Sequence, residues 1–277
     1  MKHKNILLLL AGAIVLIACN NNSKSKPEVK EETATPKLKE EDVSYFQDNT
    51  NLKGYLVYDS STDKKRPAVL VVHEWWGMTD YPKMRARKLA ELGYVAMAVD
   101  MYGNGTTANN PDDAQKMAMP FYQDPKMAKN RLEIFIHALK QYSEVDTSNI
   151  AAIGYCFGGG ILLNTVRLGE DLKAVVSFHG SLVGTPANKN LLKTKILVCH
   201  GADDKFVLQP EVEKFKRQMD SIGADYTFKQ YAGATHAFTN PAATALGQKF
   251  SIPIAYNAAA DSASWNDMKE FFGRIFK

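Results

Sequence analysis

The chain has 277 residues, of which 45% are hydrophobic and 23% charged, with a formal net charge of +4. This length and balance allow one large α/β domain with a buried core, or two small domains. No basic stripe with interleaved aromatic residues is present, which argues against a nucleic-acid-binding protein.

The N-terminal end has the pattern of an export signal. Lys2 and Lys4 precede the apolar run 6–18, which is shorter than the roughly 20 residues that cross a bilayer as a helix. The run ends in the segment 16–19, L-I-A-C, which resembles the lipobox of bacterial lipoproteins. That resemblance implies cleavage before Cys19 and acylation of its thiol and amino group. A plain cleaved signal with a chance cysteine is the alternative.

The next segment is polar and carries both signs of charge, so it cannot bury a core. The predicted layout is therefore a signal peptide at 1–18, a lipid-anchored flexible tether at 19–43, and a folded domain at 44–277. This layout predicts attachment to the bacterial cell envelope through the lipid at Cys19. No acidic run directly follows Cys19, which favours the periplasmic side and leaves the membrane leaflet open.

From residue 52 onwards, apolar runs of strand length alternate with amphipathic helical stretches. Helices are expected from residue 80 to about 93, from 124–125, from around Phe157, from Pro210, and around 265–275. A loop is expected at 104–110, and the irregular stretch 240–260 is a candidate lid. The expected strands are 52–58, 68–73, 94–99, 150–154, 174–178, 196–200 and 226–230.

This alternation predicts an α/β fold, with a mainly parallel, doubly wound sheet and helices on both faces. Ligands bind such sheets beyond the carboxyl ends of the strands. The residues that directly follow each strand are therefore the ones to inspect for chemistry.

A reactive side chain follows the strand 150–154 in the sequence I-G-Y-C-F-G-G-G. Gly154 and Gly158 flank Cys156, in the spacing that many hydrolases use around a nucleophilic serine, G-x-S-x-G. Taken alone, this could also be a helix-capping turn with an inert thiol. Cys199 lies inside an apolar run and is expected to be a buried core residue, although a disulfide to Cys156 stays open.

Three more polar residues follow strands: Glu74, Asp204 and His236. A nucleophile, an acid and a histidine in that chain order match the order found in α/β-hydrolases. Asp203 competes with Asp204 for the acidic role. The spacing G-x-x-D-x-x-V favours Asp204, which leaves Asp203 as a turn residue.

These residue types explain how a thiol would become a nucleophile. Cys156 would lie at the N-terminus of a helix, where unpaired N–H groups and the helix dipole favour a thiolate. His236 would share its proton, and Asp204 would hold the imidazole in the required tautomer. The backbone N–H groups of Trp75 and Phe157 would form an oxyanion hole.

The motifs together resemble the dienelactone hydrolase family, from about residue 52 to the C-terminus. The resemblance implies the α/β-hydrolase fold and a catalytic triad of Cys156, His236 and Asp204. It also implies that Glu74 contacts the thiol and helps to control its ionisation. The blocks that carry the resemblance are V-V-H-E-W-W-G (71–77), V-D-M-Y-G (99–103), G-Y-C-F-G-G (154–159), H-G-A-D-D-K-F-V (200–207) and Y-A-G-A-T-H-A-F (231–238).

The sequence departs from this family where arginines would bind a substrate carboxylate. Asn104 and Asn240 stand near those places, and an uncharged amide cannot replace a bidentate arginine contact. A neutral ester, lactone or thioester is therefore expected as substrate, with Asn104 and Asn240 among its contacts. Trp76 and Tyr155 are further candidate substrate contacts, although Trp75 and Trp76 could equally be packing aromatics.

The expected protein is thus a monomeric hydrolase of small esters or lactones that works through a thioester. The alternative class is a non-catalytic binding lipoprotein on a hydrolase fold. A thiol-redox protein is a third reading, but it lacks a C-x-x-C pair. No cofactor is expected, and no metal either, because the zinc-protease pattern that starts at His73 has Gly77 in place of its second ligand.

Overall fold

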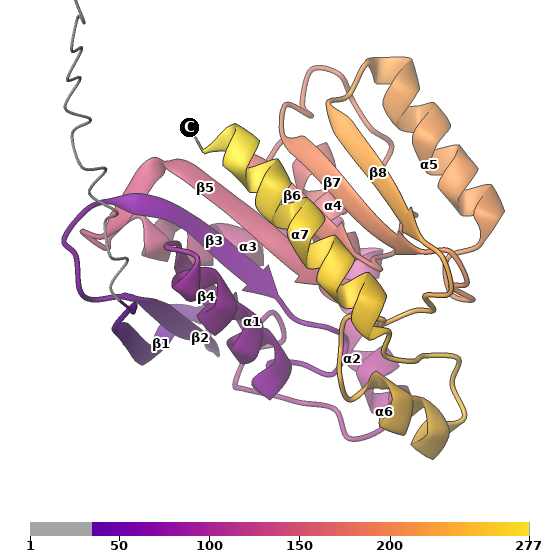
Figure 1. Ribbon diagram of the computed structural model, residues 1–277, viewed down its shortest axis with the longest axis horizontal. Helices are drawn as coiled ribbons and strands as arrows, with labels where there is room; N and C mark the ends of the chain where they lie inside the picture. The colour runs from indigo at the N-terminus through magenta and orange to yellow at the C-terminus, as the bar shows by residue number, and fades with distance from the viewer. Residues whose placement is uncertain (1–34, 277) are drawn as a thin grey trace, which may run out of the picture. The chain divides into compact units, whose positions relative to one another are not determined.

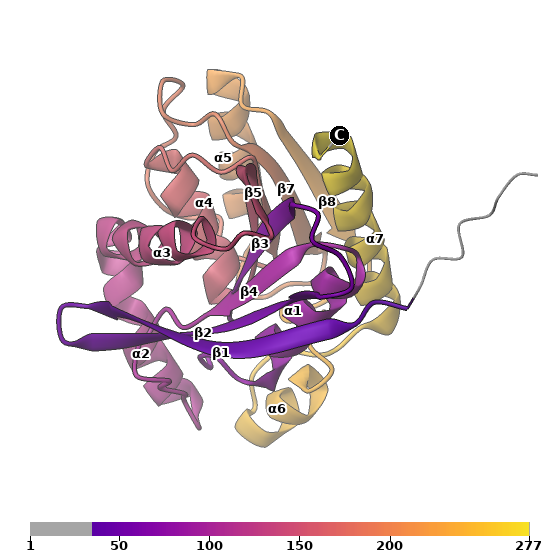
Figure 2. The ribbon, with the colours of Figure 1, turned by 90° about the vertical axis from the view of Figure 1, so that its left-hand side faces the viewer.

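An eight-stranded sheet runs through the middle of the domain, with helices on both faces (Figure 1 and Figure 2). The computed structural model describes residues 35–276. The predicted signal peptide, Cys19 and most of the predicted tether lie outside the described residues. The strands are β1 (Leu38–Gln47), β2 (Thr50–Asp59), β3 (Arg66–Val72), β4 (Val95–Val99), β5 (Val145–Tyr155), β6 (Ala174–Phe178), β7 (Lys195–Gly201) and β8 (Tyr226–Tyr231).

The strand order is β1-β2-β4-β3-β5-β6-β7-β8. The strands from β4 to β8 along this order pair in parallel, whereas β1 and β2 add an antiparallel edge. All seven predicted strands are present, and the predicted α/β fold is confirmed. The central strands β3, β4 and β6 are almost completely buried, as expected for a sheet covered on both faces, whereas the edge strand β8 is only partly covered.

Strand β1 differs from the sequence-based expectation. It begins at Leu38, inside the segment predicted to be a tether, so the predicted domain boundary at 44 is too late. The strand pairs with β2 along its whole length. An edge strand needs only every second side chain towards the core, here Val43 and Tyr45, while its charged residues reach solvent. High polarity therefore concealed a strand.

Two hydrophobic cores lie on the two faces of the sheet. Helices α2, α3, α4 and α5 contribute to one core, and α1 and α7 contribute to the other (Figure 1). The helices are α1 (Asp80–Glu91), α2 (Pro111–Gln123), α3 (Pro125–Leu139), α4 (Phe157–Arg167), α5 (Gln209–Ile222), α6 (Ala243–Phe250) and α7 (Ala258–Ile275).

Two of these helices were not expected. Helix α6 occupies part of the stretch 240–260 that was predicted to be irregular, and that prediction is wrong there. Helix α2 directly follows the predicted loop 104–110. Its start carries recognisable signals, because the Asn110 side chain accepts a hydrogen bond from the Asp113 N–H at 2.9 Å and Pro111 stands in the first turn.

The turn between β5 and α4 is the tightest point of the fold. Cys156 occupies it with φ 52° and ψ −111°, directly between the last strand residue and the first helix residue. A Cβ at Gly158 would lie 2.4 Å from the Val72 carbonyl oxygen, and one at Gly154 would lie 2.4 Å from the Gly158 backbone. The helix therefore approaches the sheet closely enough to exclude side chains at both positions.

We expect Gly158→Ala to lower the free energy of unfolding by about 1–3 kcal/mol, because the added methyl group has no space. Urea unfolding of the two proteins measures this difference. Gly273→Ala on α7 is the matched control, since a Cβ there meets no atom within 4 Å. That variant should be neutral or more stable by up to about 1 kcal/mol. Equal stabilities for the two variants would contradict the close approach.

Candidate active site

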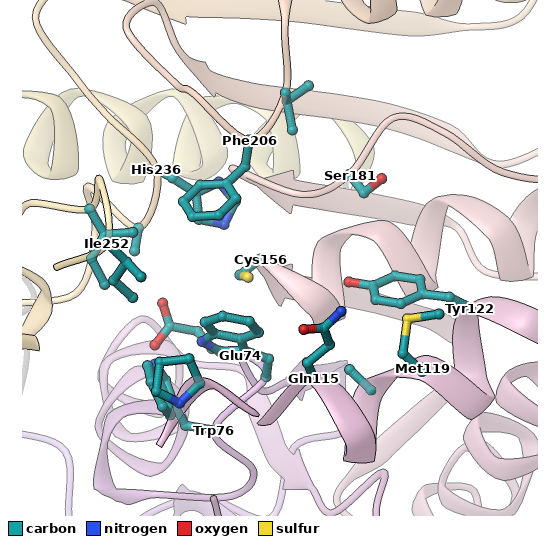
Figure 3. Close-up of a pocket in the computed structure, with 16 residues that line it drawn as sticks. Glu74, Trp76, Gln115, Met119, Tyr122, Cys156, Ser181, Phe206, His236 and Ile252 are labelled. Atoms are coloured by element: carbon teal, nitrogen blue, oxygen red, sulfur yellow. The ribbon is translucent and has the colours of Figure 1, made fainter. Parts of the chain in front are cut away.

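A cavity of about 480 Å³ lies at the carboxyl ends of the parallel strands. Its lining includes Glu74 after β3, Cys156 after β5 and His236 after β8, whose side chains converge in Figure 3. The structure thus brings together three predicted site residues that are far apart in the sequence. Their common location follows from the parallel sheet, which collects strand ends at one edge.

Asp204 is the acidic residue that contacts the histidine. His236 Nδ1 lies 2.8 Å from Asp204 Oδ2, while Asp204 Oδ1 accepts hydrogen bonds from the N–H groups of Phe206 and Val207 at 2.7 and 3.2 Å. Asp203 makes no such contact: its backbone N–H binds the Ala234 carbonyl. Asp204 is therefore fixed on both oxygens and can orient the imidazole.

The charges in this group support one another. Burial opposes a charge on His236, but the nearby Cys156 sulfur and the hydrogen bond to Asp204 raise its pKa well above the ordinary value. Burial likewise opposes ionisation of Asp204, yet the hydrogen bond and charge of His236 hold its pKa low. The arrangement favours a charged imidazolium beside the Asp204 carboxylate.

Two backbone N–H groups beside the thiol are available to an incoming oxygen. Phe157 is the first residue of α4, where N–H groups have no partner within the helix. Trp75 lies in the segment after β3 and lines the cavity. Among residues 35–276, neither of these N–H groups has a backbone acceptor. Both predicted oxyanion-hole donors are therefore unoccupied.

The Glu74 carboxyl lies in the same cavity but is held by a different partner than expected. Asn240 Nδ2 donates a hydrogen bond to Glu74 Oε2 at 2.5 Å, and no hydrogen bond between Glu74 and Cys156 occurs among the described residues. Burial raises the pKa of Glu74 to about 7, although Asn240 and the charges of His236 and Arg85 act in the opposite direction. Glu74 can therefore change charge near neutral pH.

The four predicted substrate contacts lie at different places in the structure, and not all of them reach the cavity. Trp76 lines the cavity and stacks on Phe250 of α6 with ring centroids 5.8 Å apart. Asn240 reaches the site only through Glu74. The remaining two, Tyr155 and Asn104, lie away from the cavity.

Tyr155 is fully buried and stacks on Phe178 at 4.8 Å. The prediction that it binds substrate is wrong, because side chains alternate along a strand and the residue before Cys156 points into the core. The prediction for Asn104 is also wrong: its side chain accepts a hydrogen bond from the Asn51 N–H at 3.2 Å, and it does not line the cavity. The left-handed turn at Asn104 directs it towards β2 instead.

The cavity wall also contains residues that the sequence analysis missed. The lining residues of α2 recur at intervals of three and four, so they share one face of the helix, and this face lines the cavity. The other missed wall residues come from segments after β6, after β7, after β8 and after α6. The missed lining residues are Pro111, Gln115, Ala118, Met119, Tyr122, Ser181, Phe206, Val207, Ala237, Ile252 and Ile254. For α2, the sequence signals were the helix cap at Asn110, the proline that follows it and the helical spacing beyond.

Two strand-end histidines support the site as framework residues. His73 Nδ1 lies 2.6 Å from the Glu74 carbonyl oxygen, and its Nε2 accepts from the Met101 N–H at 3.1 Å. The Cys156 N–H donates to His179 Nδ1 at 3.1 Å, so His179 carries its proton on Nε2, which lies 2.7 Å from Thr239 Oγ1. Burial lowers the pKa of both histidines, which keeps them neutral.

Residues 35–276 contain no group of three or more His, Cys, Asp or Glu side chains that could hold a metal ion. Cys156 and Cys199 are both free, and Cys199 is buried in the core as expected. No helix among the described residues is long and apolar enough to cross a membrane.

The sheet, the turn at Cys156 and the strand-end residues define an α/β-hydrolase. A solved α/β-hydrolase enzyme, MGS-M1 from a Medee basin deep-sea metagenome library, shares this fold with a TM-score of 0.64 at 14% identity, over 86% of this chain and 98% of that chain. The model of the dienelactone hydrolase family matches residues 52–276. The chain therefore belongs to the dienelactone hydrolase family and is a hydrolase of ester or lactone bonds.

Two relatives show the extent of this similarity. A protein of Aquifex aeolicus, provisionally named a carboxymethylenebutenolidase, is 30% identical over 205 residues, which cover 72% of this chain and 86% of the relative. The crystal structure of P91, a dienelactone hydrolase-like promiscuous phosphotriesterase from metagenomic libraries, is 32% identical with a TM-score of 0.80. It covers 87% of this chain and 99% of its own.

The raised pKa of Glu74 predicts a pH-dependent stability. A carboxyl whose pKa rises from 4.5 to about 7 on folding stabilises the protein fully below pH 4.5, and this contribution is lost as the pH rises through 7. Glu74→Gln, which never ionises, should therefore gain stability relative to the wild type between pH 5 and 8, by up to about 3 kcal/mol. Urea unfolding at several pH values measures this difference.

The exposed Glu270 on α7 supplies the matched Glu→Gln control. Its substitution should shift stability by the same small amount at every pH. A Glu74→Gln difference that stays constant from pH 5 to pH 8 would show that the Glu74 carboxyl ionises normally.

Proposed function

We propose that this protein hydrolyses neutral esters or lactones through a thioester on Cys156, with His236 and Asp204 as the other members of a catalytic triad. The observation that carries the proposal is the hydrogen bond of 2.8 Å between His236 and Asp204, in a cavity that also contains the Cys156 thiol. Cys156, at the start of α4, combines a helix N-terminus with a neighbouring imidazolium. Both favour the thiolate form.

The charge of the cavity supports a neutral substrate. Among residues 35–276, no lysine or arginine lines it, and Glu74 is the one carboxyl group in its wall. Arg85 is buried behind the site, where it binds the Thr239 carbonyl oxygen at 2.6 Å and the Asp261 carboxylate at 2.5 Å. A substrate carboxylate would therefore lose its hydration without gaining a lysine or arginine partner, since the His236 imidazolium is already paired with Asp204.

In the acylation step, the Cys156 thiolate attacks the carbonyl carbon and the carbonyl oxygen becomes an oxyanion. The N–H groups of Trp75 and Phe157 would donate hydrogen bonds to that oxyanion. When the tetrahedral intermediate collapses, the bond to the alkoxide breaks and His236 donates its proton to the leaving oxygen. The products of this step are an alcohol and a thioester, with His236 neutral.

In the deacylation step, His236 accepts a proton from water while the water oxygen attacks the thioester carbonyl. The second tetrahedral intermediate releases a carboxylic acid and returns the Cys156 thiolate. His236 is again an imidazolium paired with Asp204, so the resting ion pair is restored and every proton is accounted for.

Cys156→Ala should lower kcat/KM for a short p-nitrophenyl ester by about a thousandfold or more, because the nucleophile is lost. Cys199→Ala, which removes the other described thiol from the core, is the matched control. A quenched reaction of the wild type should yield a Cys156-containing peptide with the mass of the acyl adduct. A Cys156→Ala variant that keeps wild-type activity would refute the thioester and favour the non-catalytic binding reading for this cavity.

We further propose that the chain is a lipoprotein anchored to the bacterial cell envelope through Cys19. The positive residues before the apolar run 6–18 and the L-I-A-C segment at 16–19 support this proposal. The expected monomeric state stays a prediction.

Cells that express the full chain should incorporate labelled palmitate into it and retain it in the membrane fraction. Cys19→Ala should lose both the label and the membrane association, because the acylated thiol and the processing site are removed. Cys199→Ala is the control for loss of a cysteine elsewhere. Membrane retention of Cys19→Ala without any label would contradict the lipid anchor.

A further inference from the structure

The wall of the cavity that α2 contributes is not uniformly apolar. Pro111, Gln115, Ala118, Met119 and Tyr122 share one face of the helix and line the cavity. Two of them, Gln115 and Tyr122, can form hydrogen bonds. The segment after β6 adds Ser181 to the wall of the same cavity (Figure 3). We call Gln115, Tyr122 and Ser181 the polar wall.

Tyr122 is oriented so that its hydroxyl group enters the cavity. The residue exposes 37% of its surface, but the hydroxyl end of its ring points towards Cys156 (Figure 3). The ring packs edge-on against Phe157 with centroids 5.6 Å apart, which holds its direction. Burial, and then the charge of Cys156, raise the pKa of Tyr122, so the hydroxyl keeps its proton at neutral pH and can donate it in a hydrogen bond.

Ser181 completes the polar wall from a separate segment. It is half-buried, and its backbone and Cβ lie against α4, because a Cβ built on Gly160 would be 3.2 Å from the Ser181 Cβ. Within residues 35–276, none of the three polar-wall side chains forms a hydrogen bond to another residue. Their donors and acceptors are therefore available to a ligand in the cavity.

The position of His236 decides which part of the substrate meets the polar wall. The leaving oxygen must lie next to His236, because that residue supplies its proton. In Figure 3, His236 and Phe206 lie on one side of Cys156, whereas Tyr122, Met119 and Gln115 lie on another. A substrate bound to Cys156 with its alcohol part at His236 thus directs its acyl part towards α2.

We propose that the polar wall is a subsite for an uncharged oxygen in the acyl part of the substrate, with the Tyr122 hydroxyl as the main donor and Ser181 and Gln115 beside it. This inference rests on the proposed function, since it assigns the acyl and alcohol sides by the role of His236. The favoured substrates are esters or lactones whose acyl chain contains an ether, hydroxyl or carbonyl oxygen.

The chemistry of the polar wall favours such an oxygen over a charged group or a plain alkyl chain. Hydroxyl and amide groups donate to a neutral oxygen at little cost, whereas a carboxylate there would meet no cation and would share the cavity with Glu74. An alkyl chain would bury the polar wall and leave its hydrogen-bonding groups without partners. Each such loss costs about 1–3 kcal/mol.

The test compares p-nitrophenyl 3-methoxypropanoate with p-nitrophenyl pentanoate, which differ by one oxygen in place of a methylene group. The full chain purified in detergent should prefer the methoxy ester in kcat/KM. Tyr122→Phe should reduce this preference about 3- to 10-fold, in line with the loss of one hydrogen bond. Adding Ser181→Ala to the Tyr122→Phe variant should reduce the preference further. The preference is the ratio of the two kcat/KM values for one variant, so a difference in overall activity between variants does not change it.

Tyr226→Phe is the matched control, because it removes a tyrosine hydroxyl that binds Asp220 far from the cavity. Its preference ratio should equal that of the wild type. If Tyr122→Phe lowers kcat/KM for both esters by the same factor, the hydroxyl acts on the thiol and the acyl subsite is refuted. Cys156→Ala separates the two proposals. If this variant keeps its activity on the two esters, the proposed function fails. If it loses activity on both esters, the proposed function stands, and the preference ratio of Tyr122→Phe alone decides whether the subsite exists.

Discussion

The close contact between β5 and α4 is the constraint on which the site depends. Gly154 and Gly158 allow the helix to meet the sheet with no side chain between them. Cys156 is thereby forced into a left-handed conformation that few residues adopt, at φ 52°. The same conformation places the partly buried thiol at the N-terminus of α4, where it lines the cavity. Close packing of the helix on the sheet thus holds the Cys156 side chain at the cavity.

The electrostatics of the cavity follow from what surrounds this thiol. Asp204, held by two backbone N–H groups, fixes His236, and His236 in turn balances the sulfur. Glu74 is the remaining acid, and a neutral amide from Asn240 is its partner. Burial raises the pKa of Glu74 to about 7, because the amide offsets only part of the cost of burying a carboxylate, so Glu74 changes charge near neutral pH. The cavity therefore contains the His236–Asp204 pair and Glu74, and no lysine or arginine of residues 35–276 lines it.

Much of this could be read from the sequence, because the signals are local. Buried parallel strands are continuous apolar runs, and Glu74, Cys156 and Asp204 follow such runs within a few residues, while His236 lies in the loop after β8. The failures also have physical causes. The edge strand β1 has a polar composition, since only alternate residues meet the core. Tyr155 stands next to Cys156 in the chain, yet strand alternation turns it towards Phe178.

The sequence by itself determined the fold class, the order of the strand-end residues and the spacing around Cys156. Each of these depends on neighbouring residues and on periodicity, which a single chain displays directly. Only the tertiary structure decided that Asn240 binds Glu74 and that one face of α2 brings Tyr122 into the cavity. Those contacts join residues from distant parts of the chain, and the packing of helices on the sheet sets their distances. No local pattern encodes that geometry.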